Sequence, residues 1–161
     1  MSETQTSSRA EHERSLAKGV IAGLIGGLVG TLAKTFADRM FPSHNHGEAE
    51  PAELLTEQIA GHPLDEDTRH LAAQGIHWGF GAAVGAAYGA LAEFYPAATA
   101  KEGASFGMAL EALTQESALP ALGLADASHD RPLLERASEM TSHVVFGVAT
   151  ETVRAFVRKI L

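Results

Sequence analysis

Glycine recurs at every fourth position in two stretches of this 161-residue chain, and this spacing limits the folds open to it. The glycines concerned are Gly19, Gly23, Gly27, Gly81, Gly85 and Gly89. Residues four apart share one face of a helix, but each glycine inside a water-exposed helix costs roughly 1 kcal/mol relative to alanine. Inside a membrane the same spacing lets two helix backbones approach closely. The pattern therefore predicts membrane helices that pack through glycine.

Four weakly hydrophobic segments follow a polar N-terminus, and each is long enough to form a helix. They run at about residues 17–38, 71–96, 102–120 and 134–157. In the first, 15 uncharged residues separate Lys18 from Lys34, which is about 22 Å of helix. Lysines that snorkel at both ends bring this segment close to the roughly 30 Å of a hydrocarbon core. We expect an all-α fold, a four-helix transmembrane bundle with glycine-zipper packing.

A soluble four-helix bundle is the competing interpretation. Mean hydropathy is zero, and the third and fourth segments carry glutamates and a histidine that a hydropathy scan penalises. The glycine repeats favour the membrane. A cleaved signal peptide over residues 1–37 is less favoured, because the polar leader is long and no clear small-x-small cleavage site follows the apolar run.

Basic residues predict which helix ends face the cytoplasm. If four helices alternate in direction, one side of the membrane receives Arg9, Arg14, Lys18, Lys101, Arg154, Arg158 and Lys159. The positive-inside rule makes this the cytoplasmic side, so both termini are expected there. Residues 1–16 are then a flexible cytoplasmic N-terminus ahead of a membrane domain at 17–158. The outer connection, residues 39–70, is expected to hold a short amphipathic helix at residues 51–60.

Composition and motifs exclude several functions. The chain has no cysteine, so it has no disulfide, no thiolate metal site and no cysteine nucleophile. A formal net charge of -8 argues against nucleic acid as a partner. The sequence contains no GxSxG, phosphate-loop or dinucleotide motif, so we do not expect an enzyme. It indicates no particular cofactor.

Two stretches of the sequence carry a family resemblance. The first, HWGFGAAVGAAYGALAEFYP, holds His77, Glu93 and Pro96, and the second, ERASEMTSHVVFGVATETVR, holds Glu139 and His143. Over about residues 17–158 the chain resembles the YagU-like family of small bacterial inner-membrane proteins. The resemblance implies a multi-pass inner-membrane protein without an established activity, loosely associated with tolerance of acid. The shorter, histidine-bearing first outer connection and the Gln115–Glu116 pair depart from the family pattern.

Ionisable and amide side chains in the four segments are expected to meet in two polar layers. The outer polar layer is expected to contain His77, Gln115, Glu116, Glu139 and His143. The inner polar layer is expected to contain Glu93, Glu151 and Arg154. A charged group at the centre of a bilayer costs about 2.5 to 3.5 kcal/mol on insertion scales, so these groups need partners. We expect the His77 ring to lie within about 6 Å of the Glu139 or His143 side chain.

Three interpretations of these layers stay open. The first is structural: the side chains hydrogen-bond across helices, and Arg154 pairs with Glu151 or Glu93. The second is proton-linked, because histidine titrates between pH 5 and 8. The third is a metal site of two histidines and two carboxylates, although the Glu139–His143 spacing is common by chance. His44 and His46 in the acidic connection are better explained as part of a solvated loop than as a metal site.

The sequence therefore leads to two main functional hypotheses, beside the membrane-embedded metal-binding protein that the third interpretation implies. One is a small inner-membrane protein of envelope or acid-stress physiology, with the lipid bilayer as its partner. The other is a structural accessory subunit of a larger membrane complex, with other membrane-protein subunits or a second copy of the chain as partners.

Overall fold

The computed structural model describes residues 14–41, 51–125 and 131–161. The expected flexible N-terminus lies mostly outside the described residues, as do Arg9, His44 and His46. The helical elements are α2 (Leu16–Met40), α3 (Pro51–Ala60), α4 (Glu66–Phe94), the 3-10 segment η1 (Pro96–Gly103), α5 (Ala104–Leu113), the π-helical turn η2 (Thr114–Ala118), α6 (Leu119–Ala121) and α7 (Leu133–Ile160). The described residues contain no strand, so the all-α prediction is confirmed.

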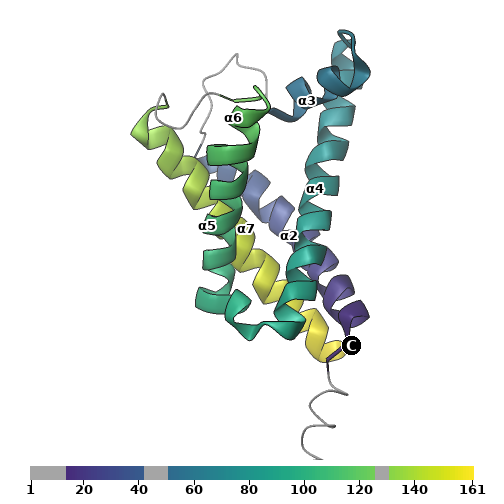
Figure 1. The fold of residues 1–161 in the computed structure, drawn as a ribbon, viewed down its shortest axis with the longest axis vertical. Coiled ribbons are helices and arrows are strands. Elements are labelled where there is room, and N and C mark those ends of the chain that lie inside the picture. The colour runs from purple at the N-terminus through teal and green to yellow at the C-terminus, as the bar shows by residue number, and fades with distance from the viewer. Residues whose placement is uncertain (1–13, 42–50, 126–130) are drawn as a thin grey trace, which may run out of the picture.

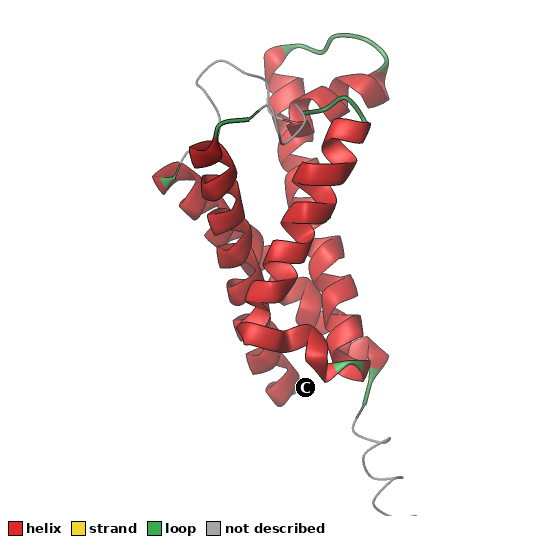
Figure 2. Ribbon diagram, turned by 60° about the vertical axis from the view of Figure 1, so that its left-hand side comes forward, coloured by secondary structure: helices red, strands yellow, loops and turns green. Residues whose placement is uncertain are grey.

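Helix α2 forms the centre of the arrangement. It packs along α4 on one side and along α7 on the other, while α5 packs against α7 (Figure 1). The start of α2 and the ends of α4 and α7 lie together at one end, where Ser15 N–H donates to Glu93 and Arg158 bonds the same carboxylate. Figure 2 shows the helices spreading apart toward the opposite end, which carries α3 and α6. We call the end with Ser15, Glu93 and Arg158 the inner end, and the end with α3 and α6 the outer end.

Local chemistry sets the helix boundaries. α4 begins at Glu66, ahead of the expected residue 71, because the Asp65 carboxylate caps it by accepting the Thr68 N–H at 3.0 Å. That hydrogen bond lowers the pKa of Asp65. α5 begins at Ala104 rather than 102, because Lys101 and Glu102 have left-handed backbone angles, with φ values of 52° and 56°. A helix cannot continue through such residues.

Polar side chains occupy much of the buried interior of the bundle. The largest fully buried side chains are Glu111, Glu139, Thr31, Thr150 and Ser142. Large apolar side chains point outward instead. On α2 the exposed ones include Ile21, Leu24, Ile25, Leu28, Val29, Leu32 and Phe36, whereas the buried positions of that helix hold only glycine, alanine and threonine. This distribution is the reverse of a water-soluble core.

Glycines line the contact between α2 and α4. A Cβ placed on Gly85 would lie 2.5 Å from both the Gly23 carbonyl oxygen and the Gly27 Cα, and one on Gly89 would lie 2.7 Å from the Gly23 Cα. A Cβ on Gly81 would collide with the Thr31 hydroxyl. The two backbones therefore touch with no room for a side chain.

Other glycines differ in their surroundings. Gly26 faces the backbone of α7, and Gly107 of α5 faces the α7 backbone at His143 and Val144. Gly75 and Gly79 repeat with the same four-residue spacing, yet a Cβ on either would meet no described atom within 4 Å. The four-residue spacing alone would therefore predict a helix contact at Gly75 and Gly79 that the described residues do not show.

One helix of the described chain, α2, is long and apolar enough to cross a membrane on length and composition. It is the one such helix among the described residues, so the four-helix transmembrane bundle stays a prediction.

Candidate functional site

The outer polar region is assembled from α5, the π turn η2 and the start of α7. Arg131, just before α7, bonds the buried Glu139 carboxylate, and its Nη2 donates to the Gln115 carbonyl oxygen at 3.3 Å. Arg136 donates to the Glu116 carboxylate at 2.8 Å. Gln115, Glu116 and Glu139 of the expected outer layer therefore come together. The two arginines that bind them lie in the connection before α7 and in its first turn.

Glu111 is a buried carboxylate in the same region, and the sequence interpretation did not assign it to the site. Glu111 is 1% exposed, and its Oε2 has no hydrogen-bond partner. The side-chain oxygen of Gln115, four residues later, is also buried without a partner. The sequence does contain a signal for assigning Glu111 to this region. Glu111 lies inside the apolar run of α5, four residues before Gln115, and side chains four apart lie on one helix face.

The two histidines of the expected outer layer lie on different helices. His77 of α4 faces α2, where its Nε2 lies 3.3 Å from the Thr35 hydroxyl, and its ring meets Trp78 edge-on. The buried His143 of α7 has its Nδ1 2.9 Å from the Glu139 carbonyl oxygen. Lys34 of α2 pairs with Asp38 on its own helix at 2.8 Å. The expected proximity of His77 to Glu139 or His143 stays a prediction.

The inner polar region contains two hydrogen-bonded ion pairs. Arg154 binds Glu151 through two nitrogens at 2.6 and 2.7 Å, and the Tyr88 hydroxyl donates to the same carboxylate at 2.8 Å. Arg158 binds Glu93 through two nitrogens at 2.8 and 2.6 Å. Glu93 was one of the two carboxylates expected to pair with Arg154. Its direct ion pair is with Arg158, one helical turn beyond Arg154.

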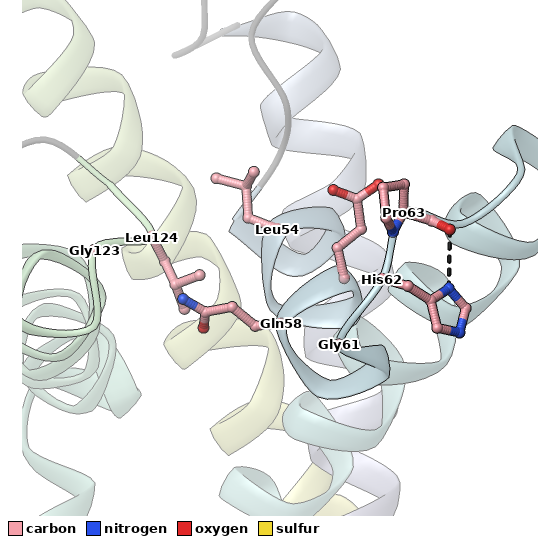
Figure 3. A pocket seen from close by; sticks show the side chains of 8 residues that line it. Leu54, Gln58, Gly61, His62, Pro63, Gly123 and Leu124 are labelled. Atoms are coloured by element: carbon pink, nitrogen blue, oxygen red, sulfur yellow. Dashed lines mark hydrogen bonds between the residues drawn. The ribbon is translucent and has the colours of Figure 1, made fainter.

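The described residues support ion pairing better than metal binding. They contain no group of three or more histidine, aspartate or glutamate side chains placed to hold a metal ion. A surface pocket lies away from both layers, between the end of α3 and the turn after α6, with Leu54, Gln58, His62 and Leu124 among its lining residues (Figure 3). It brings together none of the expected site residues.

Residues 28–152 match DUF1440, a family described as a protein of unknown function. The chain belongs to the DUF1440 family. The DUF1440 match includes His77, Glu93, Glu111 and Glu139, whereas Arg154 and Arg158 lie beyond it. No curated protein and no solved structure matches the chain. Membership of DUF1440 supplies a family but no activity.

Proposed function

We propose that this DUF1440 protein is a multi-pass bacterial inner-membrane protein whose four long helical segments all cross the bilayer. The supporting observation is a belt of uncharged surface around the bundle. No exposed residue is charged in residues 19–38 of α2, 71–94 of α4, 104–113 of α5 or 137–157 of α7. We call this surface the apolar belt.

Charged side chains within these ranges are buried or half-buried. Glu93, Glu151 and Arg154 pair in the inner region, Glu139 pairs in the outer region, and Lys34 pairs with Asp38. Apart from Glu111, these charged side chains are paired, and a surface without charge around such a polar interior suits a protein solvated by hydrocarbon. A water-soluble bundle would place the ion pairs outside and the leucines inside.

The lengths of three helices fit this proposal, and the remaining segment is shorter: α5, η2 and α6 have 10, 5 and 3 residues, together about 27 Å. α2, α4 and α7 have 25, 29 and 28 residues, which gives about 37, 43 and 42 Å at 1.5 Å per residue. Each exceeds the roughly 30 Å of a hydrocarbon core, so tilted helices would span it. α4 and α7 have lower mean hydropathy than α2 because a hydropathy average counts inward polar side chains together with the outward apolar ones.

For orientation, we propose cytoplasmic termini. Lys18, Lys101, Arg158 and Lys159 all lie toward the inner end, as the positive-inside rule requires of a cytoplasmic face. The outer end also carries arginines: Arg39 is exposed in the last turn of α2, Arg69 lies near Glu53 and Glu57, and Arg131 and Arg136 pair with Glu139 and Glu116. Because the rule counts basic residues whatever their partners, these arginines weigh against the proposed orientation.

We propose that the protein is not an enzyme and that it acts in envelope or acid-stress physiology. The association with acid is what the YagU-like resemblance implies. A structural accessory subunit is the second candidate. The open glycine face of α4 favours it, because Gly75 and Gly79 are exposed and would let a helix of another subunit or of a second copy pack closely.

A lysine in the middle of the apolar belt distinguishes lipid from water. Leu28 is exposed near the midpoint of α2. In a bilayer, Leu28→Lys should cost about 2.5 to 3.5 kcal/mol of insertion free energy and reduce the membrane-inserted fraction. In water, a lysine on an exposed surface would change stability by no more than about 0.5 kcal/mol.

The measurement is the inserted fraction of each variant in isolated membranes. Leu71→Lys is the matched control, because Leu71 is exposed near the outer end of α4, where a lysine can snorkel to water. Equal and undiminished insertion of both variants would count against the proposed membrane bundle.

A further inference from the structure

The outer polar region differs from the inner one in its charge balance. In the inner region each of the two glutamates, Glu93 and Glu151, is hydrogen-bonded by an arginine. The outer region contains three carboxylates but two guanidinium groups. Arg131 binds Glu139 and Arg136 binds Glu116, which leaves Glu111 without an arginine of its own among the described residues.

Glu111 faces all four of those charged groups. Its carboxyl group interacts electrostatically with Glu116 of η2, with Glu139 and Arg136 of α7, and with Arg131 before α7. Glu116 and Glu139 add negative potential at the Glu111 carboxylate, and Arg131 and Arg136 offset part of it. That carboxylate is fully buried and has an unpartnered oxygen. An ionised carboxylate without a partner is unfavourable in such a place.

A second unpartnered acceptor lies four residues along the chain from Glu111. Gln115 Oε1 is buried without a hydrogen-bond donor, and Gln115 lies one helical turn after Glu111. Between these positions the chain passes from α5 into the π turn Thr114–Ala118. Such turns interrupt α-helices frequently at functional sites. Each of the two acceptor oxygens lacks a hydrogen-bond donor among the described residues.

We propose that Glu111, assisted by Gln115, binds one monovalent cation, either a proton or an alkali-metal ion. With a proton, the Glu111 carboxyl group becomes a neutral O–H donor. With an alkali-metal ion, both oxygens become ligands. Either cation balances the third carboxylate of the outer region. The site goes beyond the proposed membrane function and does not depend on it, because it rests on the burial of Glu111 and on its unpartnered oxygen.

The test is the unfolding midpoint, Tm, of the detergent-purified full chain, measured across pH at fixed salt and across Na⁺ and K⁺ at fixed pH. A cation that binds only the folded state should raise Tm by roughly 5–10 °C when it is present at about 100 times its Kd. A Tm increase as pH falls identifies a proton. A Tm increase with Na⁺ or K⁺ identifies an alkali-metal ion.

Two variants locate the effect. Glu111→Gln keeps the shape of the side chain but is permanently neutral, so it should fold and lose the cation dependence. Glu116→Gln is the matched control, since Glu116 is more exposed and its partner is Arg136, and this variant should keep the dependence. The proposal is overturned if wild-type Tm responds to none of the cations, if Glu111→Gln responds as wild type does, for instance through His143, or if Glu111→Gln fails to fold.

Discussion

Replacing Gly85 with leucine should destabilise the bundle by about 3 kcal/mol or more, at the upper end of the range for overpacked cores. A Cβ at this position would lie 2.5 Å from the Gly23 carbonyl oxygen and from the Gly27 Cα. Both are backbone atoms, which cannot rotate away as a side chain can. The α2–α4 contact would have to open along its length. Thermal unfolding in detergent measures the loss.

Gly79→Leu is the matched control on the same helix. A Cβ on Gly79 would have no described atom within 4 Å, so a leucine there has room. We expect its unfolding free energy to stay within about 1 kcal/mol of wild type, the size of the glycine helix-propensity term. Equal losses for both variants would contradict the assignment of Gly85 to a tight backbone contact.

Replacing Arg154 with methionine should cost about 3 to 5 kcal/mol, because it leaves the buried Glu151 carboxylate without its two-nitrogen partner. Tyr88 would still donate one hydrogen bond, which does not neutralise the charge. Adding Glu151→Gln to the Arg154→Met variant should recover part of the loss. Unfolding free energies of the four proteins in this double-mutant cycle give the coupling.

Lys159→Met controls for the loss of a positive charge at the same end of α7. Lys159 is exposed, so its replacement should change stability by no more than about 0.5 kcal/mol. A similarly small effect of Arg154→Met would mean that the Glu151–Arg154 pair contributes little to holding the bundle together.

Helix spacing predicts which glycines share a face, but it does not identify the neighbouring helix. Gly79 and Gly81 are two residues apart, about 200° around the helix axis. Consequently Gly81, Gly85 and Gly89 face α2, while Gly75 and Gly79 face away from it. Both sets show the same four-residue repeat, so only the packing of α4 against α2 separates them.

Ion pairs between distant segments were harder to predict than helices. The pairing of Glu151 with Arg154 follows from their three-residue spacing on one helix. The partners of Glu93 and Glu139 depend on how α4, α7 and the connection before α7 meet, so Arg158 and Arg131 were missed. From the sequence, Glu111 is only one of the glutamates that a hydropathy scan penalises. Its unpartnered oxygen can be recognised only in the structure, where Arg131 and Arg136 bind the neighbouring carboxylates.

The central claim is that the apolar belt faces lipid, and membrane extraction tests it most directly. Membranes from cells that express the full chain are washed with alkaline carbonate, which removes peripheral proteins, and then with detergent. We predict that the protein stays in the carbonate-washed pellet and enters solution only with detergent, because its exposed leucines, isoleucines and phenylalanines need an apolar solvent. Recovery as a soluble monomer without detergent would contradict the claim and favour the aqueous four-helix bundle.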